Sequence, residues 1–258
     1  MSELLERIPS FQILAAAGLA AALAALFFHY VVFGPHRVES DQKKRDVARF
    51  SGWERLIHAT TLLSFVTLGV TGMIAAIGYG TRLTGWLWIV HSFAAPVFTL
   101  GVTLIVVMWA RDGRFASYDL EWFRYMGGYA GIGKHKHLPA GRFNAGQKVF
   151  LWVIALLVLV VLFSGIGRMY PVFGPLGQEI LYQVHRYSTL IMMIAVMSHV
   201  YLGSFANPGT LGVVVWGRVT PDWAKKHHPV WWEGLGVEKS KAPKKSGKKN
   251  TGKKKSKK

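Results

Sequence analysis

The chain has 258 residues, of which 51% are hydrophobic, 13% aromatic and only 17% charged, and its mean hydropathy is positive. This composition excludes an ordinary soluble domain and indicates a multi-span membrane protein. The net charge of +18 would suit a nucleic-acid-binding protein, but eleven lysines and no acidic residue fall between Lys239 and Lys258, so most of that charge belongs to a tail. The absence of cysteine excludes disulfides, cysteine-ligated iron–sulfur clusters and c-type haem attachment within the chain.

The first apolar run extends from Phe11 to Phe33, and its 23 residues are enough to cross the hydrocarbon core of a bilayer. A signal peptide is the alternative interpretation. The run is too long for a signal core, the preceding MSELLER is not positively charged, and no small-residue cleavage site follows. We therefore expect a transmembrane helix here.

A polar segment rich in Arg and Lys, His36 to Arg55, leads into the second apolar run, from about Leu56 to Ile77. Short basic loops stay in the cytoplasm, so this loop predicts that the N-terminus lies outside. His58, at the start of the second run, is then at the cytoplasmic side. Gly69, Thr71 and Gly72 on the same run would allow a planar group or a neighbouring helix to come close, and for the glycines alone plain helix packing is the preferred explanation.

The third span is expected from about Trp86 to Ala110, with His91 near its outer end. The tryptophans beside that histidine suit an interfacial aromatic belt. The long connection from Arg111 to Lys148 is basic and returns the chain to the cytoplasm, where we expect a short surface helix and then a glycine-rich loop. The fourth span, Val149 to about Gly167, contains no histidine.

The fifth span lies within the stretch from Glu179 to Phe205 and carries two histidines, His185 and His199, fourteen residues apart. At about 1.5 Å of rise per residue this spacing is roughly 21 Å, close to four whole helical turns. Both imidazoles should therefore project from one face of the helix, His185 toward the outside and His199 toward the cytoplasm. The segment after this span and the lysine tail are expected to be cytoplasmic.

Loop charge thus sorts four intramembrane histidines into two levels: His58 with His199 toward the cytoplasm, and His91 with His185 toward the outside. Histidines within a membrane are costly unless they are paired, so each is a candidate functional residue. A lone histidine could equally hydrogen-bond two helices, but four in depth-matched pairs favour ligation. Zinc requires three or four ligands at one centre, whereas each level offers two. Two imidazoles on opposite sides of a planar ring indicate haem, so we expect two b haems that transfer electrons and leave no open iron position.

Two further sets of residues suit this chemistry. Arg55, Arg168 and Arg186 lie near the same levels and are candidates to pair with haem propionates, although interfacial arginines need no haem to explain them. In GRFNAGQK, immediately before the fourth span, Asn144 and Gln147 could hydrogen-bond a quinone carbonyl at membrane depth. A helix cap and a turn are the simpler interpretation of that motif.

Four motifs in order resemble the gamma subunit of respiratory formate dehydrogenase, which is the membrane cytochrome b of that complex. The resemblance extends over most of the chain, and the motifs are RFSGWERLIH at Arg49 to His58, GRFNAGQK at Gly141 to Lys148, HRYSTLIMMIAVMSHVYL at His185 to Leu202, and VTPDWAKKHHPVWWE at Val219 to Glu233.

The resemblance implies four spanning helices and two b haems, the outer one held by His91 and His185 and the inner one by His58 and His199. It also implies a site for menaquinone, or ubiquinone in its place, around Asn144 and Gly146 with His199 close by. Together with Gln147 from the motif chemistry, these are the expected quinone-binding residues.

The resemblance further implies partners and a location. An iron–sulfur beta subunit, itself fed by a molybdenum or tungsten alpha subunit, would deliver electrons from outside, and this chain would not oxidise formate by itself. The expected location is the bacterial inner membrane, with the N-terminus outside and the C-terminus in the cytoplasm. Related alternatives are the cytochrome b subunit of a hydrogenase or a thiosulfate reductase. A haem-free transporter or scaffold, whose histidines bind substrate or relay protons, is an alternative of a different class.

The predicted fold is therefore an all-α integral membrane protein, a four-helix cytochrome b bundle with one extra N-terminal transmembrane helix that the family core lacks. The expected divisions are an N-terminal helix at 1–35, a di-haem core at 36–205, a cytoplasmic segment at 206–238 and a disordered lysine-rich tail at 239–258.

Overall fold

The structure of the chain is a computed structural model that describes residues 10–38, 44–79, 82–133, 136–170 and 172–236. Five helices in these ranges are long and apolar enough to cross a membrane. They are α2 (Phe11–Phe33), α3 (Gly52–Met73) with its π-helical continuation η1 (Ile74–Tyr79), α4 (Gly85–Trp109), α6 (Ala145–Met169) and α7 (Gly174–Gly203). The all-α membrane fold predicted from the sequence is confirmed. The lysine-rich tail lies outside the described residues.

Polar caps explain why two spans begin before their apolar runs do. Ser51 accepts the Glu54 N–H at 3.2 Å, and the Glu54 carboxylate accepts the Ser51 N–H at 2.8 Å, which completes a capping box at the start of α3. Asn144 and Gln147 form the same box at the start of α6. Each box satisfies backbone donors that a helix end leaves free, so the helix can begin in polar sequence.

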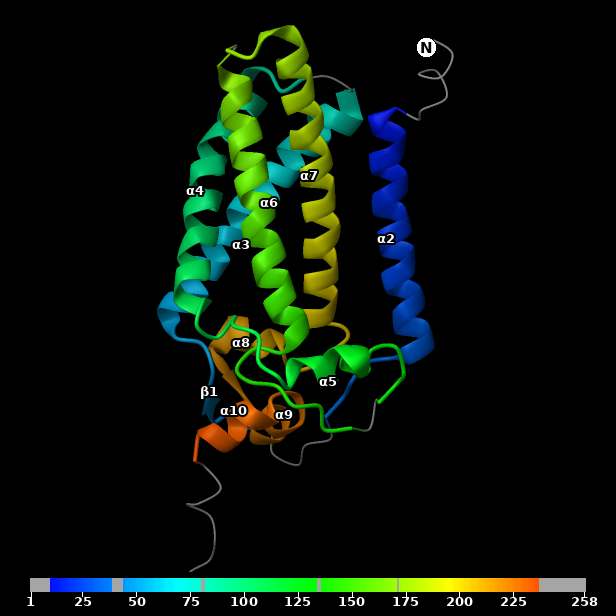
Figure 1. Cartoon of the computed structure of the whole chain (residues 1–258), viewed down its shortest axis with the longest axis vertical. Helices are drawn as coiled ribbons and strands as arrows, with labels where there is room; N and C mark the ends of the chain where they lie inside the picture. The colour runs from blue at the N-terminus through cyan, green and yellow to red at the C-terminus, as the bar shows by residue number, and fades with distance from the viewer. Residues whose placement is uncertain (1–9, 39–43, 80–81, 134–135, 171, 237–258) are drawn as a thin grey trace, which may run out of the picture.

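The spanning helices form two antiparallel pairs, α3 with α4 and α6 with α7, and α4 also contacts α6 (Figure 1). Helix α2 lies outside this four-helix bundle, where it contacts α7 and η1. Helices α3 and α4 approach closely at Gly101, because a Cβ atom there would overlap the Thr61 hydroxyl. The extra N-terminal helix is thus a peripheral addition to a bundle of four.

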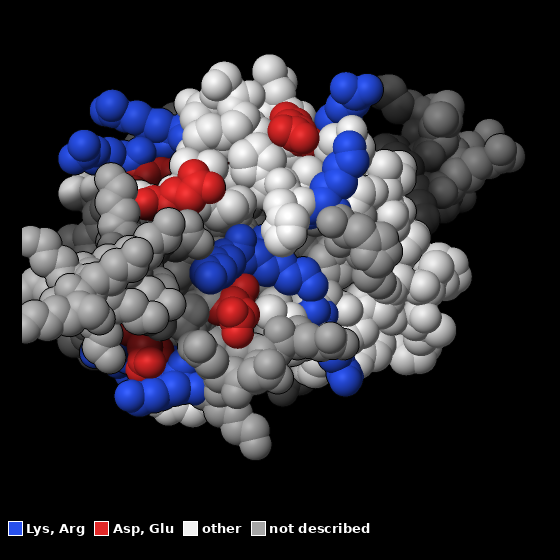
Figure 2. All heavy atoms as spheres, turned by 90° about the horizontal axis from the view of Figure 1, so that it is seen from below, with Lys and Arg blue, Asp and Glu red and all other residues white. Residues whose placement is uncertain are grey.

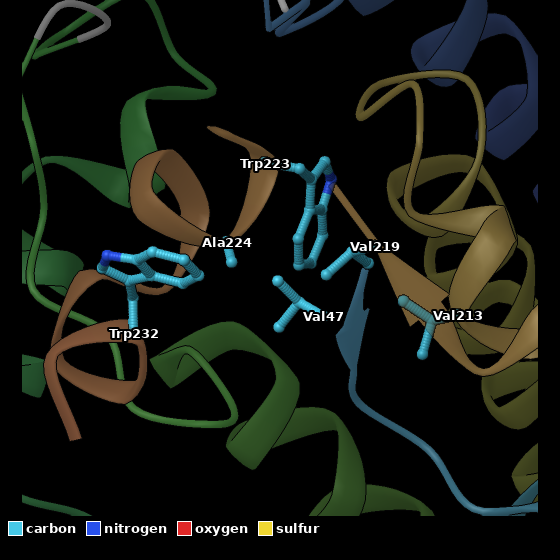
Figure 3. Close-up of a cluster of buried hydrophobic side chains, with 6 residues drawn as sticks. All are labelled: Val47, Val213, Val219, Trp223, Ala224 and Trp232. Carbon is cyan, nitrogen blue, oxygen red and sulfur yellow. The ribbon is translucent and has the colours of Figure 1, made fainter. Parts of the chain in front are cut away.

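One end of the bundle is closed by a small folded unit, which we call the cap. In it β1 (Val47–Ala48) pairs antiparallel with β2 (Arg218–Val219), next to α8 (Leu211–Trp216), α9 (Pro221–His227) and α10 (Pro229–Gly234). Apolar side chains from all five elements converge in a buried core (Figure 3): Val47, Val213, Val219, Trp223, Ala224 and Trp232. The segment before α3 and the segment after α7 therefore fold together.

Buried arginines join the cap to the bundle. The Arg49 guanidinium lies over the Trp223 ring at 4.9 Å, and its Nη2 donates to the Arg142 carbonyl at 2.6 Å. Burial lowers the pKa of Arg49 to about 9. Arg142 in turn donates to Glu54 at 2.6 Å and to Asp112 at 2.8 Å.

The connection between α4 and α6 lies at the same end as the cap and contains α5 (Asp119–Arg124) and the 3-10 turn η2 (Met126–Gly128). Lys and Arg side chains surround this end, with fewer Asp and Glu between them (Figure 2). The described Lys and Arg residues of the opposite end are Arg82, Arg168 and Arg186.

Candidate histidine pairs and their surroundings

The pair nearer the cap is formed by His58 of α3 and His199 of α7. Their ring centroids are 6.4 Å apart. The His58 Nδ1 atom is buried and has no hydrogen-bond partner among the described residues. Phe150 of α6 stacks on the His199 ring with centroids 4.2 Å apart and an interplanar angle of 5°. His58 and His199, which the sequence places at one level, therefore lie next to each other.

The pair nearer the opposite end is formed by His91 of α4 and His185 of α7, again with ring centroids 6.4 Å apart. The Thr71 hydroxyl, 2.8 Å from His91 Nδ1, donates to the Thr67 carbonyl, so it accepts the Nδ1 hydrogen of His91. The His185 Nδ1 atom lies 3.0 Å from the Val161 carbonyl, which can only accept. Both rings thus carry their proton on Nδ1 and leave the Nε2 lone pair for a metal, as metal-bound histidines usually do.

Both separations suit two imidazoles on opposite sides of one metal ion. A metal–imidazole bond is about 2 Å long and the ring centroid lies about 1.1 Å behind the nitrogen, so the centroids should be about 6.2 Å apart. Each level supplies two nitrogen donors, and within the described part of the chain no three His, Cys, Asp or Glu side chains gather into a metal cluster. A haem, which brings four nitrogen ligands of its own, matches this donor set.

Two glycines make room beside the pair of His91 and His185. A Cβ atom at Gly165 would lie 3.3 Å from His185 Cε1, and one at Gly72 would lie 3.7 Å from His91 Cε1. The contact at Gly165 is tighter than a side chain tolerates without displacing its neighbour. The group that comes close to Gly72 is thus the imidazole of His91.

The three arginines proposed for propionates fall into two groups. Arg168 and Arg186 both stack on the Tyr182 ring, at 4.3 and 4.8 Å, at the end of the bundle that holds His91 and His185. Arg55 instead donates to two carbonyls of α8, that of Val214 at 2.9 Å and that of the next residue. Arg168 and Arg186 lie together, whereas Arg55 is held against the cap.

The residues proposed for quinone binding lie at the start of α6. The Asn144 side-chain oxygen accepts the Gln147 N–H at 2.9 Å, and the Gln147 side-chain oxygen accepts the Asn144 N–H at 3.0 Å. The hydrogen bonds assign each amide orientation: each side-chain oxygen accepts one hydrogen bond, and no described residue accepts from either NH2 group. The simpler interpretation, a helix cap, is therefore correct, and it leaves donors of the kind that a quinone carbonyl needs.

Another histidine within a span, His29 of α2, has a different environment. Its Nε2 atom lies 2.9 Å from the Tyr129 carbonyl and its Nδ1 atom lies 2.6 Å from the Tyr201 hydroxyl. Because the carbonyl can only accept, Nε2 carries the proton and Nδ1 accepts from Tyr201. Both ring nitrogens are engaged, which distinguishes His29 from the two histidine pairs.

The sequence did not identify the partners of the paired histidines. The Thr71 hydroxyl lies 2.8 Å from His91 Nδ1, the Ser164 hydroxyl lies 3.1 Å from His185 Nδ1, and Phe150 stacks on His199. Hydroxyl residues in spanning helices commonly bond to a neighbouring helix, which is the one available signal. That signal does not say which histidine each hydroxyl meets.

Two family models match the chain. The model for prokaryotic cytochrome b561 matches residues 49–221, which include α3, α4, α6 and α7. A model described as formate dehydrogenase N, transmembrane, matches residues 11–43, which include α2.

Curated relatives cover most of the chain. The cytochrome b556(Fdn) subunit of the nitrate-inducible formate dehydrogenase of Escherichia coli K12 is 27% identical over 223 residues, 79% of this chain and 97% of that protein. The cytochrome b556(fdo) subunit of formate dehydrogenase from the same organism is 27% identical over 219 residues, 74% of this chain and 94% of that protein. The formate dehydrogenase cytochrome b556 subunit of Haemophilus influenzae is 26% identical over 199 residues, 74% of this chain and 81% of that protein.

Proposed function

The chain belongs to the prokaryotic cytochrome b561 family, and from this premise we propose that it is the di-haem cytochrome b subunit of a membrane-bound formate dehydrogenase complex. The relatives described above are named as cytochrome b556 subunits of formate dehydrogenases. The observation that carries the proposal is that two histidines on α7 each face a histidine of another helix, both at 6.4 Å.

Four histidines of this chain would hold the haems, and neighbouring side chains would orient those histidines. His58 with His199 would hold one haem b, and His91 with His185 a second. When bound between two imidazoles, haem supplies one-electron transfer without an open iron position. Thr71 keeps the His91 proton on Nδ1.

The start of α6 would bind the quinone, either menaquinone or ubiquinone. The NH2 groups of Asn144 and Gln147 would donate to a quinone carbonyl, and Gly146 and His199 would lie nearby. The quinone oxygens would take protons at the cap end, where the chain is polar and charged.

The charge asymmetry of the bundle supports an orientation with the cap in the cytoplasm and the N-terminus outside, in the bacterial inner membrane. An iron–sulfur subunit, supplied by a molybdenum or tungsten subunit that oxidises formate, would dock outside. Electrons would then cross inward while protons are taken up from the cytoplasm, which separates charge without a proton pump.

Haem stoichiometry tests the proposal. The pyridine haemochrome spectrum of the purified chain should give two b haems per chain, and one in each of His185→Ala and His199→Ala. His29→Ala is the matched control, because His29 also lies in a span but has both nitrogens engaged, and it should retain both haems. A single haem that survives both His185→Ala and His199→Ala, or no haem in the wild type, would refute the proposal.

A further inference from the structure

The indole of Trp122, on α5, lies directly against Gly146 of α6. A Cβ atom at Gly146 would come within 2.6 Å of the indole Cη2 atom and within 3.3 Å of Cζ2 and Cζ3. Real Cβ atoms do not approach other atoms so closely, so the contact requires glycine at this position. Gly146 therefore provides the surface against which the indole lies.

The turn after α5 holds the same indole from another direction. Gly127 has a φ of +64°, and a Cβ atom there would overlap Cζ2 of the Trp122 ring. The Tyr129 ring packs against Trp122 edge to face, with centroids 6.3 Å apart. The indole is thus held in one place by two glycines and a tyrosine.

This place lies beside both the proposed donors and the histidine pair nearer the cap. Gly146 and Phe150 are four residues apart on α6, so they share one face of the helix. Phe150 stacks on His199 at 4.2 Å. Gly146, against which the indole lies, is therefore about one helical turn, roughly 6 Å along the axis, from Phe150, and the Asn144–Gln147 capping box is in the same turn of α6 as Gly146.

We propose that the Trp122 indole is one wall of the quinone site and that the quinone ring packs against it, while the Asn144 and Gln147 amides donate to a carbonyl of that ring. This inference rests on the proposed function. A quinone is a flat apolar ring with two acceptors, and such ligands are recognised by aromatic surfaces together with a few placed donors. Gly127 and Gly146 act as positioning residues for the indole.

Kinetics of haem reduction by a quinol test the inference on the purified, haem-loaded full chain. With 2-methyl-1,4-naphthoquinol as the reductant, Trp122→Leu should raise KM about tenfold and leave the limiting rate within about twofold, since ground-state and transition-state binding are lost equally. Trp122→Phe, which keeps an aromatic face, should recover most of the affinity. Gly146→Ala keeps the tryptophan but displaces it, so it should raise KM as Trp122→Leu does.

The matched control is Leu120→Ala. Leu120 lies on the same short helix α5 and is 74% exposed, so its substitution disturbs that helix without touching Gly146. Intact haem spectra and unchanged unfolding temperatures exclude a general loss of structure. Quenching of tryptophan fluorescence by the oxidised naphthoquinone adds a readout that packing alone would not change, and Trp122→Phe should lose part of that quenching.

The outcomes separate the two proposals. Haem in the wild type that the quinol cannot reduce would overturn the proposed function together with this inference. Wild-type reduction with the same KM in Trp122→Leu, Gly146→Ala and Leu120→Ala would overturn only the role of Trp122.

Discussion

Thr71→Val should weaken the binding of one haem and spare the other. Valine has nearly the shape of threonine but cannot accept the Nδ1 hydrogen of His91, which the Thr71 hydroxyl accepts at 2.8 Å. Thr71 is only 4% exposed, so water cannot readily take over that hydrogen bond. The substitution would leave a buried donor without an acceptor on a proposed axial ligand.

Two independent arguments give the magnitude. A buried donor left unsatisfied costs about 1–3 kcal/mol. Loss of the hydrogen bond that orients a metal-bound histidine typically lowers metal affinity by about 10- to 100-fold, equivalent to about 1.4–2.7 kcal/mol. The two ranges agree, so we expect the haem between His91 and His185 to leave the protein about 10- to 100-fold more readily.

Haem transfer to excess apomyoglobin, followed by the Soret spectrum, measures this loss for each haem. The midpoint potential of the same haem should rise, because an imidazole without the hydrogen bond is a weaker donor to ferric iron. Thr67→Val is the control, since Thr67 lies one turn away on α3 and its hydroxyl bonds only the Leu63 carbonyl. Equal haem release from Thr71→Val and Thr67→Val would show that the hydroxyl does not support the ligand.

Two further predictions concern stability. Gly101→Ala should destabilise the bundle by about 1–3 kcal/mol, because its Cβ would overlap the Thr61 hydroxyl. Gly69→Ala is the control and should not destabilise it, because the nearest atom to its Cβ would be 3.9 Å away. Thermal unfolding of the two variants, followed by circular dichroism, tests this. Burial, and then the nearby Arg49 charge, hold the pKa of His228 well below its usual value of about 6.5, so His228 is neutral in the folded cap. Below pH 6.5 the unfolded chain binds a proton there that the folded chain does not, and the free energy of unfolding falls by about 1.4 kcal/mol per pH unit. The protection of the α9 and α10 amides against hydrogen exchange, relative to the intrinsic exchange rate at each pH, should therefore fall between pH 7 and pH 5. It should fall less in His228→Asn, whose amide can still donate as His228 Nδ1 does at 2.7 Å, and an equal fall in both would contradict the assignment.

The sequence was sufficient for the membrane helices and for the candidate ligands. The length of an apolar run and the charge of its flanks are local properties, so the run from Phe11 to Phe33 was predicted with the bounds that α2 has. The fourteen-residue spacing of His185 and His199 placed both on one face of α7 because helical periodicity is fixed. Loop charge alone then matched each with the histidine that lies opposite it.

Contacts between distant segments could not be read in this way. The cap pairs Val47 with Val219, and no local pattern announces a two-residue strand whose partner lies so far along the chain. The same holds for the Thr71 hydroxyl at His91 and for the Trp122 indole on Gly146, where side chains meet only after several helices have packed.

The sequence by itself therefore determined which segments form the helices of membrane-spanning length and at which end of the bundle their histidines lie, because hydropathy and helical periodicity act along the chain. Only the tertiary structure decided which hydroxyl holds which imidazole, how the cap closes one end, and what covers the start of α6. Those choices depend on how side chains fit across helix interfaces, where a single missing Cβ decides how closely two elements approach.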